Sequence, residues 1–225
     1  MNSLIFFAQA GVDESLFVWY VKACGPIFSP LFVLISIVFV TLAIMNWLAI
    51  SRNAIVPTDM IEQFHEKLKA KEFQEAYEIA KGSDSTLGKI FAVGLVKMSE
   101  NAAASAALRV SAAEQAMNDT AEEEVMALEH RLGYLGTVAS VSPMVGLLGT
   151  VGGMIWVFNI LSSGGPPQAS ELAGGIALAL VTTQIGLLIA IPALVFFEVF
   201  KTRLARYTLE ISLQTENVLN RFKQN

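Results

Sequence analysis

The chain of 225 residues is 54% hydrophobic and only 16% charged, and its formal net charge at pH 7 is −5. Such a balance is unusual for a soluble domain and favours a membrane protein. Fourteen acidic residues outnumber nine basic ones in the segment 51–133, which argues against a nucleic-acid partner. Cys24 is the only cysteine, so an internal disulfide and a cysteine-rich metal site are excluded.

Three apolar stretches are each long enough to cross a bilayer. They are residues 28–50, 134–161 and 172–200, and none has an ionisable residue near its centre. Because a helix rises about 1.5 Å per residue, about 20 apolar residues cross a hydrocarbon core of roughly 30 Å. We therefore expect three transmembrane helices. An ion that moves along such helices needs a carboxylate from another chain.

The basic residues predict the orientation of the chain in the membrane. Fourteen of the fifteen Lys and Arg residues lie in 51–133 and 201–225. Since basic residues near span ends stay on the cytoplasmic side, we expect these two segments to be cytoplasmic. The short loop 162–171 and the N-terminal segment 1–27 are then periplasmic. Aromatic residues predict that the N-terminal segment is amphipathic and lies on the bilayer surface; they are Phe6, Phe7, Phe17, Trp19 and Tyr20.

The cytoplasmic segments have helical patterns. Hydrophobic periodicity after Pro57 predicts two short helices joined by a turn, and the run from Gly82 to Ser85 breaks the pattern. No proline or glycine occurs between about Ala102 and Gly133, which predicts one long helix that enters the second span, and the third span continues likewise into the tail 201–225. Both extensions carry an apolar stripe, which we expect to pack on the other stripe and on neighbouring subunits. The stripes are Val110, Met117, Ala121, Leu128, Leu132 and Leu135, and Leu204, Thr208, Ile211, Thr215, Val218 and Phe222.

The second and third spans combine small and polar residues. Glycines at 146, 149 and 153, and at 175 and 186, let another helix approach the backbone closely. A proline in each span interrupts the backbone ladder. A single intramembrane threonine commonly bonds to its own helix, but several polar side chains in adjacent spans favour a wet path or bonds between helices. The residues concerned are Gly146, Gly149, Gly153, Gly175, Gly186, Pro143 and Pro192 for packing and kinks, and Thr150, Thr182, Thr183 and Gln184 for the ion pathway.

Two motifs resemble a known family. Gly146-Leu-Leu-Gly-Thr150-Val and Gly175-Ile-Ala-x-Ala-Leu-x-x-Thr183-x-x-Gly186-Leu-x-x-Ala190-Ile-Pro192 are similar to the signatures of the MotA/TolQ/ExbB proton-channel family, nearest the three-span ExbB/TolQ branch. The resemblance implies an all-α motor subunit of the bacterial inner membrane. Five copies would form a ring, with the second and third spans lining its lumen.

The resemblance also implies partners and an ion. Single-span proteins of the ExbD or TolR kind would sit inside the ring, and each would bring an aspartate that binds and releases H⁺. A TonB- or TolA-like protein would receive the energy for uptake or for a Tol-like role in the envelope. By position, Thr150 and Thr183 would be the lumen hydroxyls that face the aspartate. No cofactor is implied.

One position departs from the family pattern. The ExbB/TolQ branch usually has a glutamate five residues before the third-span threonine, whereas this chain has Leu178. The departure leaves open a Na⁺-coupled or gliding-type stator, and also a structural membrane scaffold that conducts nothing. An enzyme is not expected, because no catalytic constellation or phosphate-binding loop is visible.

Overall fold

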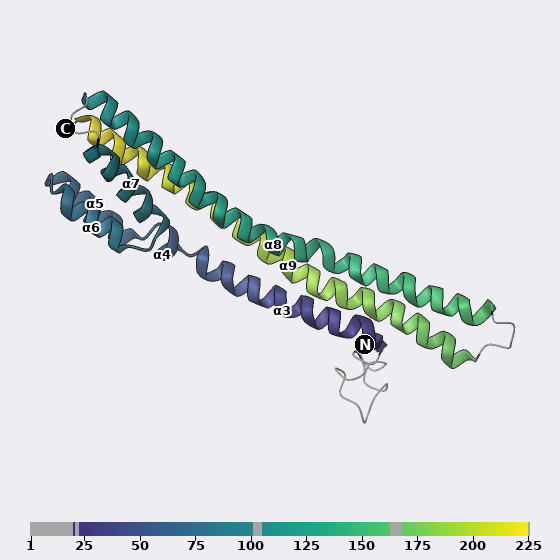
Figure 1. The fold of residues 1–225 in the computed structure, drawn as a ribbon. Coiled ribbons are helices and arrows are strands. Elements are labelled where there is room, and N and C mark those ends of the chain that lie inside the picture. The colour runs from purple at the N-terminus through teal and green to yellow at the C-terminus, as the bar shows by residue number, and fades with distance from the viewer. Residues whose placement is uncertain (1–19, 21–22, 101–104, 163–167, 225) are drawn as a thin grey trace. The chain divides into compact units, whose positions relative to one another are not determined.

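The computed structural model describes residues 20, 23–100, 105–162 and 168–224, and it is all-helical over these residues (Figure 1). Three of its helices, α3, α8 and α9, are long and apolar enough to cross a membrane. The helices after Tyr20 are α3 (Gly25–Ala49), α4 (Arg52–Ile55), α5 (Thr58–Lys69), α6 (Phe73–Gly82), α7 (Thr86–Glu100), α8 (Ala106–Ser162) and α9 (Ala169–Gln224).

The helices follow the sequence pattern closely. Helices α5 and α6 confirm the two short helices expected after Pro57, and α6 ends at Gly82, where the pattern breaks. Helices α8 and α9 are continuous through Pro143 and Pro192, so neither proline ends a helix. The four-residue helix α4 was not predicted. Most of the expected N-terminal amphipathic segment, and residues 163–167 of the expected periplasmic loop, lie outside the described residues.

The chain divides into two compact units, and unit 1 comprises Met1–Leu42 and Leu135–Phe196. In its described part, Cys24 and Phe32 of the first helical region form a buried cluster with Val181 of α9. Gly25 begins α3 with φ +71°, a left-handed conformation that side chains other than glycine rarely adopt. Many large apolar side chains of this unit, such as Leu188 and Phe158, are more than half exposed. Exposure on that scale suits helices that face lipid or other apolar chains.

Unit 2 comprises Ala43–Tyr134 and Phe197–Asn225. Its core joins α5 to α7, where the rings of Phe64 and Phe91 stack with centroids 4.4 Å apart. The parts of α8 and α9 in this unit lie side by side (Figure 1). Most of their stripe residues are buried, for example Met117 and Val218 at 0% exposure, while Ala121 and Thr208 are half-buried. This burial confirms that the two stripes pack within the chain, while their packing on other subunits stays a prediction.

Polar contacts tie the short helices of unit 2 to the long ones. Arg52 of α4 donates to Glu210 of α9 at 3.0 Å. The amine of Lys89 in α7 lies 2.8 Å from a carboxylate oxygen of Glu124 in α8. All four of these side chains are partly exposed, so each pair contributes at most about 1 kcal/mol and mainly fixes orientation.

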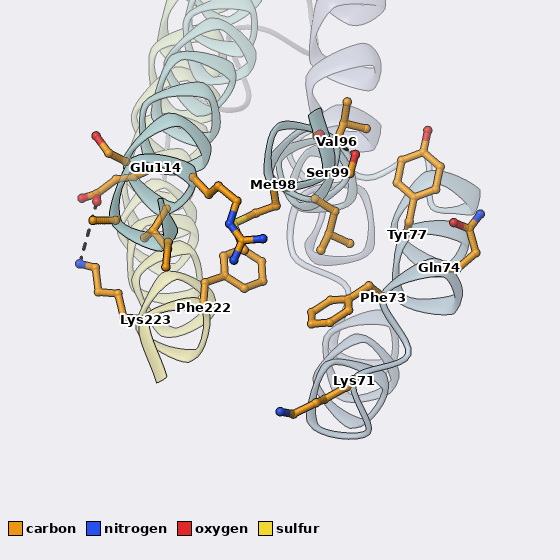
Figure 2. Close-up of a pocket in the computed structure, with 16 residues that line it drawn as sticks. Lys71, Phe73, Gln74, Tyr77, Val96, Met98, Ser99, Glu114, Phe222 and Lys223 are labelled. Carbon is orange, nitrogen blue, oxygen red and sulfur yellow. Dashed lines mark hydrogen bonds and ion pairs between the residues drawn. The ribbon is translucent and has the colours of Figure 1, made fainter. Parts of the chain in front are cut away.

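A groove of about 1010 Å³ opens in unit 2 between the short helices and the ends of α8 and α9. Figure 2 shows Phe73 and Tyr77 on one side, Phe222 on the side of the long helices, and Met98 between them. At its far wall Lys223 pairs with Glu114 at 4.0 Å. The described residues that line the groove combine apolar rings with charges of both signs.

Candidate ion-conducting site

Glycines bring α8 and α9 together backbone to backbone in unit 1. A Cβ added at Gly146 would lie 2.9 Å from the carbonyl oxygen of Thr182, and one added at Gly186 would lie 2.7 Å from that of Ser142. A Cβ at Gly153 would lie 2.7 Å from the carbonyl oxygen of Gly175. Real Cβ atoms essentially never come so close to backbone, so only glycine allows this approach.

The close approach places two threonine hydroxyls against each other. Thr150 of α8 and Thr183 of α9 share a hydrogen bond through their hydroxyl oxygens. Thr150 Oγ1 also lies 3.1 Å from the carbonyl oxygen of Ala179 and 3.3 Å from that of Gly146. Thr183 Oγ1 lies 3.3 Å from the same two carbonyl oxygens. The hydroxyls and the carbonyls therefore form one small polar cluster, which we call the threonine pair.

The threonine pair has more acceptors than protons. Each hydroxyl has a single proton to donate, while both hydroxyl oxygens and both carbonyls can accept. Both side chains are half-buried, so they are neither sealed in the helix contact nor fully open. Rotation of either hydroxyl can redirect its proton to a new acceptor without leaving a donor unsatisfied. The pair is thus suited to form reversible hydrogen bonds with an acidic group.

The other two predicted pathway residues lie in different surroundings. Thr182 is fully buried, its hydroxyl lies 2.8 Å from the carbonyl oxygen of Leu178 in its own helix, and its side chain fills the space beside Gly149. This environment favours a packing role. Gln184 is exposed, and its amide oxygen accepts a hydrogen bond from the Tyr20 hydroxyl at 3.3 Å.

Leu178, the position of the departure, is half-buried on α9. Its methyl carbon would lie 3.8 Å from a Cβ built on Gly25, so the side chain lies near the start of α3. Glu171 is the only Asp, Glu, Lys or Arg among the described residues of unit 1. The described residues also contain no group of His, Cys, Asp or Glu that could hold a metal ion. Glu171 lies twelve residues before Thr183 in α9, about 18 Å along the helix, so the described residues of unit 1 place no carboxylate at the threonine pair.

Two residues at the site were missed by the sequence analysis. Ser142 is fully buried where α8 meets Gly186, and its hydroxyl donates to the carbonyl of Val138 at 2.6 Å. Its four-residue spacing from Gly146 was the available signal. The link from Tyr20 to Gln184 joins residues 164 positions apart, and no local pattern could have revealed it.

Comparison with known proteins agrees with the motifs. The sequence pattern of the MotA/TolQ/ExbB proton channel family matches residues 83–212, a range that includes both threonines of the pair. The chain is 32% identical over 175 residues to the Tol-Pal system protein TolQ of Haemophilus influenzae, which covers 73% of this chain and 76% of that protein.

Two further relatives match shorter stretches. The biopolymer transport protein ExbB of Salmonella typhimurium is 41% identical over 75 residues, 33% of this chain and 31% of that protein. The TolQ protein of Pseudomonas aeruginosa is 42% identical over 89 residues, 40% of this chain and 38% of that protein. The family pattern covers more than half of the chain and the first TolQ match covers almost three quarters of it. The chain therefore belongs to the MotA/TolQ/ExbB proton channel family, whose TolQ and ExbB members are multi-pass membrane subunits of energy-transducing channels and motors and not enzymes.

Proposed function

We propose that this chain is the ring subunit of an inner-membrane motor driven by the proton motive force. Five copies would surround single-span partners of the ExbD or TolR kind, and each partner would bring one intramembrane aspartate. A TonB- or TolA-like protein would carry the energy to the envelope. The observation that carries the proposal is the threonine pair, two hydroxyls that meet in a helix contact without a carboxylate of their own.

The proposed orientation follows the basic residues. Segments 51–133 and 201–225 would be cytoplasmic, while 1–27 and 162–171 would be periplasmic, with spans at 28–50, 134–161 and 172–200. An inward-moving proton then releases about 2.3 kcal/mol per 100 mV of membrane potential. This energy would drive each step of the partner inside the ring.

The threonine pair would act on the charged form of the partner aspartate. A hydrogen bond to an ionised carboxylate contributes about 1.5–3 kcal/mol, so the two hydroxyls would hold the carboxylate while it is charged. When Thr150 and Thr183 turn their protons to the carboxylate, the Gly146 and Ala179 carbonyls can keep their bonds within the helices. Protonation of the aspartate removes this attraction and lets it pass the apolar wall. Thr182 and Gln184 would shape and border this path.

Replacement of Thr183 by valine tests the proposal, because it keeps the shape and removes the hydroxyl. In vesicles that contain the chain and an ExbD/TolR-type partner, Thr183→Val should abolish proton flux, and Thr183→Ser should retain most of it. Thr41→Val is the matched control, since the Thr41 hydroxyl donates to the carbonyl of Ile37 in its own helix, at 2.9 Å. Normal flux through Thr183→Val, with the assembly intact, would refute the pathway.

A non-conducting scaffold and a Na⁺-coupled stator are the alternatives, and Leu178 is the residue that favours them. The scaffold predicts no flux in the complete complex under either ion gradient. The Na⁺ alternative predicts flux that follows the Na⁺ gradient at constant pH. The proposal predicts flux under a proton gradient without Na⁺.

A further inference from the structure

A basic pocket lies in unit 2 where α3 ends and α9 leaves its apolar stretch. It has a volume of about 310 Å³, comparable with the smallest ligand sites. Three arginines line it with a single carboxylate, that of Glu210, so its local charge is positive. The arginines are Arg52, Arg203 and Arg206.

The three arginines are arranged differently. Arg52 is held by Glu210 at 3.0 Å. The guanidinium of Arg203 lies over the ring of Trp47, 5.4 Å from its centroid. Arg206 lines the same pocket and is exposed. Two of the cations are therefore oriented by contacts within unit 2, which fixes the pocket before any ligand binds.

The surroundings are those of a membrane interface. Trp47 is 55% exposed at the end of an apolar helix, in the manner of tryptophans that lie at headgroup depth. Tyr207, Leu209 and Leu213 also line the pocket, and the two leucines are more than half exposed. A positively charged pocket beside an interfacial tryptophan matches a ligand with an anionic head that lies at the membrane surface. Such basic pockets at the cytoplasmic side of transmembrane helices suit anionic lipid headgroups.

We propose that this pocket binds the phosphate of an anionic phospholipid. Arg206 and Arg203 hydrogen-bond the phosphate oxygens, Arg52 neutralises Glu210, and Trp47 lies beside the glycerol region. The assignment of this lipid to the cytoplasmic leaflet rests on the proposed orientation of the chain. The preference for an anionic lipid does not depend on that orientation. Binding of this kind anchors the lower ends of α3 and α9 at one depth in the membrane.

Tryptophan quenching tests the proposal in the full-length chain. The chain has three tryptophans, so the substitutions Trp19→Phe and Trp156→Phe leave Trp47 as the reporter. This single-tryptophan protein is placed in phosphatidylcholine bilayers that contain increasing amounts of brominated phosphatidylglycerol or brominated phosphatidylcholine. The binding constant from quenching should be at least fivefold larger for phosphatidylglycerol.

Two charge-matched variants decide between a site and a diffuse attraction. Arg206→Gln should reduce the preference about fivefold, because the bound phosphate loses one of its two arginine partners. Arg131→Gln removes the same charge from an exposed residue outside the pocket and should leave the preference unchanged. Equal quenching by both lipids would overturn the proposal. This is the result expected if another copy of the chain or a protein partner covers the arginines. Equal losses in the two variants would also overturn it. The assay requires neither partner nor proton flux, so its outcome is independent of the proposed motor function.

Discussion

The close contact between α8 and α9 can be tested with two adjacent glycines. A Cβ at Gly153 would lie 2.7 Å from the carbonyl oxygen of Gly175 and 3.0 Å from the amide nitrogen of Ala179, whereas ordinary contact begins at 3.4 Å. A Cβ at Gly152 would have nothing within 4 Å. Both substitutions to alanine change the intrinsic helix preference equally, so their difference isolates the contact. Because backbone atoms cannot turn aside, Gly153→Ala should cost about 1–3 kcal/mol relative to Gly152→Ala.

Separation of the helices should also disturb the threonine pair, which lies about one turn from Gly153. Thermal unfolding of the two variants in the same detergent gives the energetic difference. Disulfide formation between cysteines placed at 150 and 183, in a Cys24→Ser background, reports the distance, and it should be slower in Gly153→Ala. Equal unfolding midpoints and equal cross-linking rates in the two variants would refute the packing described above.

Two further predictions concern unit 2. Lys71 has φ 62° at the end of α5, which costs a non-glycine residue about 1–2 kcal/mol. Lys71→Gly should therefore stabilise the folded chain by about 0.5–1 kcal/mol, once the larger backbone entropy that glycine loses on folding is subtracted. The unfolding midpoint should rise, and a lower midpoint would contradict this. Burial, ahead of nearby positive charges, holds the pKa of His65 below its usual value of 6.5. Stability from the neutral ring is thus complete above pH 6.5 and is lost as the pH falls from 6.5 through the lower folded-state pKa, because the unfolded chain binds the proton first. His65→Gln should flatten the dependence of the unfolding midpoint on pH between 7.5 and 5; an unchanged slope in this variant would show that His65 is not the source.

The helical architecture could be predicted because its determinants are local. The length of the apolar stretches predicted three helices that could cross a membrane. The apolar stripes from Val110 to Leu132 and from Leu204 to Phe222 predicted which faces of the long helices are buried. Helix α4 was missed because its four residues carry no periodic signal; its start depends on a cap, in which the Ser51 hydroxyl accepts from the amide of Ala54.

The candidate site was only partly accessible to sequence reasoning. The face shared by Gly146, Gly149 and Gly153 indicated a close helix contact, but the partner of each glycine depends on the relative rotation of α8 and α9. That rotation buries Thr182 and turns Thr183 toward Thr150, although the two residues are adjacent in sequence. A one-residue difference corresponds to about 100° around a helix, so it decides between a buried packing residue and a residue that meets Thr150.

The central claim is that this chain supplies hydroxyls and that another chain supplies the carboxylate. Proton flux should be measured in vesicles that contain the chain alone, the chain with a single-span ExbD/TolR-type partner, and the chain with the same partner after its intramembrane Asp→Asn substitution. We predict flux only in the second preparation. Flux at the same rate through the chain alone, or through the complex with the Asp→Asn partner, would contradict the account.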